Sequence, residues 1–277
     1  MQKLNRRKLF KKVGISLVGA GIYAGLLPVM GQLSSRYMNE NPSGRDSSLN
    51  KPVDPTVVPE FDRPDLPQEE VNFIANHEII IGDTQRKVIA MTYDDVTEDR
   101  QIVDLLDVYQ EHGVKATFFV MGADLIHCKV NVPRLVEEGH ELAFHGWVHD
   151  YPFTQLSDDA LHTQFRMFSY QVQNLLPGYR VRYFRAPFGD RNQRVRDIAA
   201  QWGMQHVLWS LESGGNDRFT ITNVVDRVKP GDIVLSHVNR IYDISEADTI
   251  IRALIRKGFN LETLSGAIPA PMKFSPI

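Results

Sequence analysis

The chain has 277 residues, of which 43% are hydrophobic and 23% are charged, and its formal net charge is −3. This composition is typical of a folded globular protein and excludes a wholly disordered, collagenous or disulfide-stapled chain. The single cysteine, Cys128, excludes an intramolecular disulfide and a cysteine metal cluster, so a metal site would need histidine and carboxylate ligands. Beyond residue 35 acidic groups outnumber basic ones, which argues against nucleic acid as a partner.

The first 35 residues have the pattern of an export signal or of a single membrane anchor. Six lysines and arginines fall within residues 1–12, and the segment 13–35 is uncharged and mostly apolar. A basic region before an apolar segment is typical of both kinds of targeting segment. The run 5–11 (NRRKLFK) also resembles a twin-arginine export motif. We therefore expect the protein to be exported to the cell envelope or the extracellular space, and to stay anchored in the membrane if this segment is not cleaved.

A proline-rich stretch follows the targeting segment. Six prolines lie between positions 42 and 67. Proline at this density is incompatible with a regular helix or a central strand. We therefore expect a disordered linker over residues 36–77 and a folded domain over residues 78–277.

In the folded domain, short apolar runs alternate with amphipathic stretches. Strands are expected at 87–93, 116–121, 141–145, 183–187, 206–212, 232–237 and 260–264, and helices at stretches such as 98–112, 195–202 and 248–257. In the first of these helices, the residues expected on one apolar face are Ile102, Leu105, Leu106 and Tyr109. Seven strands alternating with helices predict a parallel sheet. No glycine-rich phosphate loop follows the first strand, which favours a barrel over a nucleotide-binding sheet.

Residues capable of catalysis or metal binding lie at the ends of four of these strands. They are Asp94 and Asp95 after the first strand, His145 and His149 at and after the third, Arg185 in the fourth, and His237 at the end of the sixth. The carboxyl ends of the strands form the active-site face of a βα barrel. We therefore expect these six side chains to meet at one mouth of the barrel.

Counting ligands indicates what such a set can do. One carboxylate and two imidazoles bind a divalent ion and leave other positions open to water and substrate. The ion would polarise a carbonyl oxygen and lower the pKa of bound water, and a second aspartate could accept the proton of that water. A neighbouring arginine would keep this aspartate ionised, and a histidine on the opposite wall could protonate the leaving group. The set predicts metal-assisted hydrolysis of an amide or an ester.

Four short motifs resemble those of the NodB-homology polysaccharide deacetylases, carbohydrate esterase family 4. The run 91–96 (MTYDDV) resembles the family motif TFDDG, and 145–149 (HGWVH) resembles H-[ST]-x-x-H. The run 184–189 (FRAPFG) contains R-x-P-[YF]-G, and 235–237 (LSH) is similar to L-x-H. The matches follow the family order over roughly residues 78–266. The resemblance implies a distorted (β/α)7 barrel of the NodB type.

The resemblance also implies a role for each matching residue. Asp94 corresponds to the general base, Arg185 to the residue that orients it, and His237 to the general acid. The corresponding metal ligands are Asp95, His145 and His149, usually for Zn²⁺, with Co²⁺, Ni²⁺ and Fe²⁺ as alternatives. Around the substrate, the backbone N–H of Phe188 matches an oxyanion donor, and Leu235 lines the acetyl pocket. Independently of the resemblance, Trp209 could stack on a sugar ring because its side chain is aromatic.

Three positions depart from the family pattern. Val96 replaces the glycine of the first motif, and Gly146 replaces the serine or threonine of the second. The fourth motif, an aspartate-rich D-x-x-D-W segment in the family, is replaced by residues 209–217 (WSLESGGND). Either Glu212 or Asp217 could pair with His237 and raise its pKa, and Asp217 is our choice.

The resemblance implies a metal-dependent hydrolase that removes N-acetyl groups from a cell-envelope or extracellular polysaccharide of the N-acetylglucosamine type. Two other readings stay open on the same fold. One is an O-acetyl esterase or a hydrolase of a non-sugar amide. The other is a non-catalytic barrel that binds a glycan without turnover, which the departures at Val96, Gly146 and the fourth motif suggest.

Overall fold

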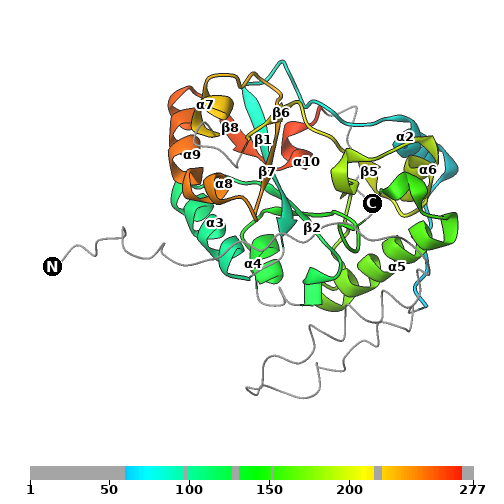
Figure 1. Ribbon diagram of the computed structural model, residues 1–277. Coiled ribbons are helices and arrows are strands. Elements are labelled where there is room, and N and C mark those ends of the chain that lie inside the picture. Colours follow the sequence, from blue (N-terminus) through cyan, green and yellow to red (C-terminus); the bar gives the residue numbers. More distant parts are fainter. Residues whose placement is uncertain (1–59, 97–98, 127–130, 151, 215–219, 270–277) are drawn as a thin grey trace, which may run out of the picture. The chain divides into compact units, whose positions relative to one another are not determined.

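The computed structural model describes residues 60–96, 99–126, 131–150, 152–214 and 220–269. Within these ranges, parallel strands form a curved sheet, and helices surround it (Figure 1). The strands are β1 (Val88–Val96), β2 (Thr117–Val120), β3 (Glu141–Phe144), β4 (Tyr183–Phe184), β5 (Gln205–His206), β6 (Leu211–Glu212), β7 (Ile233–His237) and β8 (Asn260–Glu262). The helices are α2 (Gln68–Asn76), α3 (Asp99–His112), α4 (Asn131–Glu137), α5 (Asp158–Leu175), α6 (Gln193–Gln201), α7 (Thr220–Val225), α8 (Ile241–Ser245), α9 (Ala247–Arg256) and α10 (Leu264–Ala267).

The strand order is β5-β4-β3-β2-β1-β7-β6, and β8 pairs with the start of β1. Every pairing is parallel, as the alternation of strands and helices predicted. Strand β1 is long enough for β8 to pair with its first residues and β2 with its last ones. The curved parallel sheet confirms the predicted distorted (β/α)7 barrel of the NodB type.

The distortion arises where the sequence predicted one strand over residues 206–212. This segment forms two short strands, because β5 pairs with β4 and β6 pairs with β7, so that β5 and β6 are the two edges of the sheet. Between them, Val207 makes a parallel bridge with Ile79, and the N–H of Leu208 donates to the carbonyl of Ile79 at 2.7 Å. The two edges are therefore joined through the chain itself and not through a ladder between β5 and β6.

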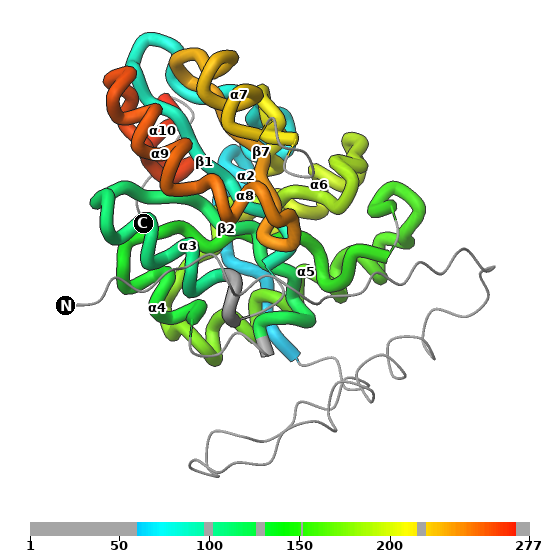
Figure 2. The backbone as a smooth tube through the Cα atoms, turned by 60° about the vertical axis from the view of Figure 1, so that its left-hand side comes forward, coloured from blue at the N-terminus to red at the C-terminus, as the bar shows by residue number. Residues whose placement is uncertain are grey.

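Helix α3 confirms the predicted apolar face. Its four face residues, Ile102, Leu105, Leu106 and Tyr109, are fully buried. The hydroxyl of Tyr109 donates to that of Tyr93 on β1 at 3.1 Å, which fixes the helix against the sheet. Helix α9 packs beside α3, and α7 packs beside α9, on one side of the sheet (Figures 1 and 2).

Helix α2 lies inside the range predicted as a disordered linker, so that prediction is wrong for residues 68–76. The prolines end at Pro67, directly before the helix, and the stretch that follows has no helix breaker. Ile74 and Ala75 are buried, and Arg196 of α6 donates to the carbonyl of Ala75 at 3.3 Å. The folded part of the chain thus begins before residue 78.

The predicted export or anchor segment, residues 1–35, and the linker up to residue 59 lie outside the described residues. Among the described helices, none is long and apolar enough to cross a bilayer. Export and anchoring stay predictions from the sequence.

Candidate active site

The carboxyl ends of the strands open into a cleft of about 490 Å³. A volume of this size is typical of ligand pockets. The predicted site residues that line the cleft are Asp94, Asp95, His145, His149, Phe188, Trp209, Leu235 and His237. Strand register explains the meeting of two motifs, because the pairing of β1 with β7 sets Asp94 opposite His237. The structure therefore brings the four motifs together, as the sequence predicted.

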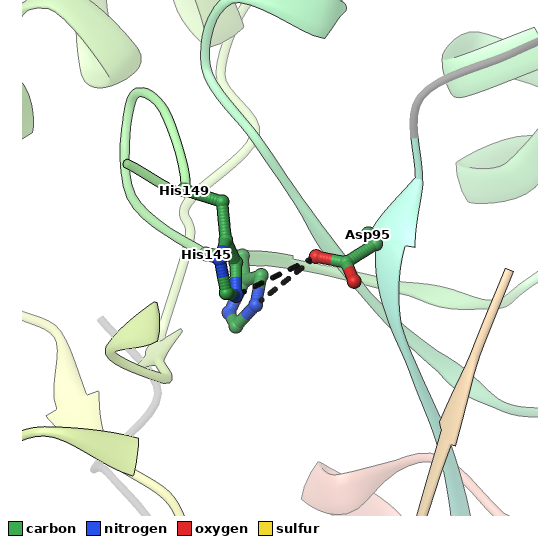
Figure 3. Close-up of side chains that lie close together, drawn as sticks. All are labelled: Asp95, His145 and His149. Carbon is green, nitrogen blue, oxygen red and sulfur yellow. Dashed lines mark ion pairs between the residues drawn. The ribbon is translucent and has the colours of Figure 1, made fainter. Parts of the chain in front are cut away.

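Three of these residues form a cluster that could hold a metal ion. The Oδ1 atom of Asp95 lies 3.5 Å from Nε2 of His145 and 3.8 Å from Nε2 of His149 (Figure 3). The three candidate ligand atoms all lie within 4.8 Å of one another. Atoms that bind one tetrahedral zinc ion at about 2.0–2.1 Å are themselves roughly 3.4 Å apart. The separations are thus longer than hydrogen bonds and close to those of ligands that share an ion.

The hydrogen bonds around the cluster also fit a cation. Asp95 Oδ1 and His145 Nε2 are buried and have no hydrogen-bond partner, although most buried polar atoms have one. Nδ1 of His145 lies 2.9 Å from the carbonyl oxygen of Arg185, which can only accept, so Nδ1 carries the proton. In the neutral ring, Nε2 then has a free lone pair directed at Asp95. This donor set fits a divalent cation such as zinc.

The members of the cluster shift one another's pKa. Burial acts to raise the pKa of Asp95, but His145, with His149 and His237, lowers it to about 2. Burial acts to lower the pKa of His145, but the negative charges of Asp94 and Asp95 raise it above its ordinary value. The carboxylates therefore favour positive charge at the centre of the cluster.

In the first motif, the residue with a positive φ is Asp95 and not Val96, which stands where the family has glycine. Asp95 has a φ of 57°, whereas Val96 is not among the described residues with positive φ and is buried at the end of β1. Aspartate enters the left-handed region more readily than most residues with a side chain. The side-chain amide of Asn239 donates to Asp95 Oδ2 at 3.0 Å and leaves Oδ1 to face the histidines. The sequence analysis missed Asn239, which lies in a loop outside any recognised motif.

The second motif needs glycine where the family has serine or threonine. Gly146 has a φ of 86°, and a Cβ atom there would lie 3.0 Å from Cγ of Pro187 and 3.1 Å from the ring of Phe153. The next residue, Trp147, donates its main-chain N–H to Oε1 of Gln164 at 3.0 Å. Close packing and this bond therefore hold the loop between the two histidines without a hydroxyl.

Arg185 lies behind the cleft and holds Asp94. Its guanidinium is fully buried and donates to Asp94 Oδ1 at 2.7 Å and to Thr92 Oγ1 at 3.0 Å. It also donates to the carbonyls of Val207 and Leu208 at 3.3 and 2.8 Å. Burial lowers the pKa of Arg185, and the charge of Asp94 opposes that shift. Asp94 is thus fixed through Oδ1, and its Oδ2 faces the metal-ligand cluster, 3.6 Å from Nε2 of His145.

The predicted substrate-contact residues form the rest of the wall. Phe188 is 64% exposed, has a φ of 61°, and sets its ring edge-on to His149 with centroids 4.3 Å apart. Leu235 is buried in the floor of the cleft. Trp209 is half-buried and also packs over the guanidinium of Arg185, 5.6 Å from the ring centroid. These side chains give the cleft an apolar part beside its charged centre.

The acidic partner predicted for His237 stays a prediction. Asp217 lies outside the described residues. Glu212 has an exposed side chain, and within the described residues it pairs with Arg240 at 3.3 Å. The sequence analysis missed a third carboxyl group, that of Asp243 in α8, which accepts a hydrogen bond from the main chain of His237.

A further acidic residue that the sequence analysis missed is Asp124, in a short turn after β2. Burial, together with the negative charge of Asp95, raises the pKa of Asp124 to about 7. No pattern in the sequence distinguishes this aspartate from an ordinary surface residue.

Comparison with known proteins identifies the family. Residues 81–207 match the family model for polysaccharide deacetylase. The chitooligosaccharide deacetylase of Bradyrhizobium sp. (strain ANU 289) is 29% identical over 195 residues, which are 64% of this chain and 88% of that relative. The solved structure of the Bc1960 peptidoglycan N-acetylglucosamine deacetylase has 25% identity and a TM-score of 0.65, and the match covers 73% of this chain and 97% of that one.

A second solved structure shares the fold alone. BA3943 from Bacillus anthracis, described as a pseudoenzyme of carbohydrate esterase family 4, has 22% identity and a TM-score of 0.65, with 70% of this chain and 69% of that chain covered. Fold and family matches together define a hydrolase of the polysaccharide N-deacetylase class. Residues 81–207 thus carry a polysaccharide deacetylase domain, and the predicted resemblance to the NodB-homology deacetylases, carbohydrate esterase family 4, is confirmed. Because a pseudoenzyme has the same fold, the fold alone does not establish turnover, which depends on the site residues.

Proposed function

We propose that the protein is a metal-dependent N-deacetylase that acts on an N-acetylglucosamine-containing polysaccharide of the cell envelope or the extracellular space. The observation that supports this most strongly is the cluster of Asp95, His145 and His149, with Asp94 held beside it and His237 in the same cleft. The names of two relatives, a chitooligosaccharide deacetylase and a peptidoglycan N-acetylglucosamine deacetylase, support the substrate class.

The proposed metal is zinc, with Co²⁺, Ni²⁺ and Fe²⁺ as alternatives for the same donor set. Asp95 Oδ1, His145 Nε2 and His149 Nε2 would hold it, since these three atoms gather at one point. A divalent ion bound there polarises the acetyl carbonyl and makes water a better nucleophile at neutral pH.

Asp94 is the proposed general base. Arg185 fixes its Oδ1 atom, so that Oδ2 stays directed at the ligand cluster. Oδ2 takes a proton from the attacking water as the new C–O bond forms at the acetyl carbon. The backbone N–H of Phe188, which the family motif predicts as an oxyanion donor, would stabilise the charge on the acetyl oxygen.

His237 is the proposed general acid. It lines the same cleft as the metal-ligand cluster, at the end of β7. Its Nδ1 atom is buried, so the Nε2 side of the ring faces the cleft. Nε2 gives a proton to the amide nitrogen as the C–N bond breaks, and the products are acetate and a free amine on the sugar.

Acetate release by the full-length chain tests this proposal. The substrates are N-acetylglucosamine oligomers, peptidoglycan and acetylated xylan, each with zinc or cobalt added. Wild-type protein should release acetate from an N-acetylated substrate, and Asp94→Asn should lose about 100-fold or more because the base is gone. Asp107→Asn on the exposed side of α3 is the matched control and should keep full activity.

The outcomes separate the alternatives. Release from acetylated xylan alone would favour the O-acetyl esterase. Bound metal without release from any substrate would favour the glycan-binding barrel or a non-sugar amide substrate, and failure to bind any divalent metal would contradict the site itself.

We further propose that the first 35 residues direct export and, if uncleaved, anchor the protein in the membrane. The support is the basic region followed by an apolar segment. Fractionation of cells that produce the full chain tests this, with a variant lacking residues 1–35 as the control. Recovery of the full chain in the cytoplasm would contradict the proposal.

A further inference from the structure

The segment between α2 and β1 runs beside β5 (Figure 1). The main-chain N–H of Ile79 in this segment donates to the carbonyl of His206 at 3.0 Å. Glu78 comes directly before Ile79 and lies outside residues 81–207, the part of the chain that matches the family model. The family motifs therefore give Glu78 no role.

The carboxylate of Glu78 is surrounded by nitrogen atoms of basic side chains. Its Oε1 atom lies 2.8 Å from Nδ1 of His206, 3.2 Å from Nε of Arg191 and 3.8 Å from Nη1 of Arg196. The hydrogen bond with His206 and the charges of the two arginines hold the pKa of Glu78 below its ordinary value, although burial opposes them. Glu78 is thus an ionised carboxylate that is bonded through a single oxygen atom.

The ring of His206 joins Glu78 to the loop after β4. Its side chain is fully buried, and its Nε2 atom accepts the main-chain N–H of Ala186 at 3.4 Å. Because that N–H can only donate, Nε2 carries no proton, and the proton of the neutral ring is on Nδ1. Burial lowers the pKa of His206, which favours the neutral ring. Nδ1–H therefore donates to Glu78, and one imidazole connects the carboxylate to the main chain of Ala186.

A second path from Glu78 reaches the other end of the same loop. Arg191 donates to Glu78 through Nε and to the carbonyl of Gly189 through Nη1 at 3.4 Å. Glu78 thus acts indirectly on two main-chain groups, the N–H of Ala186 and the carbonyl of Gly189. Between them Phe188 has a φ of 61°, a conformation that persists in a residue with a side chain only where the surroundings hold it.

We propose that Glu78 is a positioning residue for the main chain at Phe188. It acts through His206 on one end of the turn and through Arg191 on the other. This inference rests on the proposed function, in which the N–H of Phe188 stabilises the charge on the acetyl oxygen. An oxyanion donor is effective only when it already points to the place where the charge develops. The described residues that line the cleft do not include Glu78, so it acts on the turn and not on the substrate.

The position of the turn can be measured without substrate. In ¹H–¹⁵N spectra of the full-length protein, the amide signals of Phe188 and Gly189 should shift in Glu78→Leu, because both paths to the turn are lost. They should stay close to the wild-type positions in Glu78→Gln, because Oε1 takes all three contacts and an amide oxygen can replace it. Long-range spectra with ¹⁵N-labelled histidine should show the ring proton of His206 on Nδ1.

Glu70→Leu is the matched control. Glu70 lies in α2, its side chain is 17% exposed like that of Glu78, and it pairs with Arg180 at 3.5 Å. Within the described residues it makes no hydrogen bond or ion pair with the turn. Its removal takes an equally exposed carboxylate from the same part of the chain, so the amide signals of Phe188 and Gly189 should not move.

Kinetics on the N-acetylated substrate is the second measurement. We expect kcat of Glu78→Leu to fall about 10-fold, less than the roughly 100- to 1,000-fold for complete loss of an oxyanion donor, while KM changes less than about threefold. Glu78→Gln should keep kcat within about threefold of the wild type, and Glu70→Leu should leave it unchanged. Zinc affinity should be the same in all three variants. A role in folding alone would lower the urea midpoint of Glu78→Leu without changing kcat of the folded enzyme.

A double-mutant cycle tests the path through Arg191, whose side chain is exposed. Arg191→Leu removes one of the two paths, so kcat should fall less than in Glu78→Leu. Because Arg191 would act on the turn together with Glu78, the double variant should lose no more than Glu78→Leu alone. Losses that multiply in the double variant would show that Arg191 acts independently of Glu78 and would contradict this path.

The remaining outcomes are equally decisive. Unchanged amide signals of the turn in Glu78→Leu would overturn the proposal, and so would a fall in kcat that Glu70→Leu shares in full. A ring proton on Nε2 of His206 would contradict the path through that residue. If Glu78→Leu fails to fold, the wild-type histidine spectrum and Arg191→Leu still decide. Absence of acetate release by the wild type would reject the proposed function, while the spectra would separately confirm or reject the positioning of the turn.

Discussion

The two ends of the parallel sheet differ in how their buried polar side chains are bonded. At the amino-terminal end, Glu141 begins β3 and accepts hydrogen bonds from Thr117 Oγ1 and the main-chain N–H of Ser265, both at 3.1 Å, and from the hydroxyl of Ser265. Beside it, Nδ1 of His140 accepts the main-chain N–H of Ala116 at 3.1 Å, while Nε2 of the same ring is buried without a partner. These bonds join β2, β3 and α10 and serve the fold.

At the carboxyl end, more of the buried polar side chains keep unpaired atoms. Of the seven buried side-chain atoms without a partner in the described residues, four belong to Asp95, His145, His237 and Asp243. Each is unfavourable for folding unless a ligand or a proton satisfies it. The contrast teaches that changes at the amino-terminal end should alter stability, whereas changes at the carboxyl end should alter metal binding and chemistry.

Substitution of Arg185 should give the largest effect on stability. It is an exception to the contrast between the two ends of the sheet. It belongs to the active-site end, yet it is fully buried and donates to two side chains and two main-chain carbonyls. Arg185→Leu would leave Asp94 as an unpaired buried charge, so the free energy of unfolding should fall by about 3–5 kcal/mol. Urea denaturation measures this. Arg252→Leu, which removes an exposed ion pair, should cost less than about 1 kcal/mol.

His149 tests whether a change at the carboxyl end of the sheet alters metal binding. Its ring is 30% exposed, and its Nε2 atom is one of the three gathered ligand atoms. His149→Ala should weaken zinc binding by about 100-fold or more, since even residues behind the ligands contribute 10- to 100-fold. Competition with a chromophoric chelator measures the affinity. His112→Ala, on the surface pair with Asp248, should leave it unchanged, and equal affinity in both variants would remove His149 from the ligand set.

His140 tests the amino-terminal end through pH. Burial lowers its pKa to about 4, so the unfolded chain binds a proton between about pH 6.5 and 4 that the folded chain does not. Stability should therefore fall as the pH drops through this window, by at most about 3 kcal/mol from this residue. Urea titrations at several pH values should show a shallower fall in His140→Phe. An unchanged pH dependence would mean that His140 is not the group responsible.

Asn239 should give the smallest effect. Its exposed amide donates to Asp95 Oδ2 and so orients Oδ1. Asn239→Leu should weaken zinc binding by about 10-fold while the urea midpoint stays the same. Asn76→Leu, at the exposed end of α2, is the control and should change neither quantity. A lower midpoint in Asn239→Leu without a change in zinc affinity would assign Asn239 to the fold instead.

The predictable part of the site is the part fixed by strand order. Short apolar runs identify the strands, and four site residues stand at the ends of these runs: Asp94, Asp95, His145 and His237. Parallel strands bring their carboxyl ends to one edge of the sheet. The structure sets Asp94 opposite His237 for this reason. At these strand ends the apolar pattern of the sequence and the fold agree. For that reason, motifs far apart in the sequence could be placed in one cleft.

The other wall was harder to predict because its contacts are long-range. The run 206–212 looks like one strand, but its two ends pair with different neighbours, and no local pattern reveals that. Helix α2 was not predicted, because the prolines before it indicated a linker. The partner of His237 was sought in the fourth motif, whereas a buried carboxylate lies six residues after His237, in a short helix.

The sequence by itself determined the alternation of strands and helices, the family, and the set of side chains at the strand ends. Periodicity and spacing are local properties, so they can be read without coordinates. The tertiary structure alone decided that Asp95 takes the positive φ, that Asn239 and Arg185 orient the two aspartates, and that Asp243 is buried beside His237. These features depend on which distant segments pack together, and that packing exists only once the whole sheet has formed.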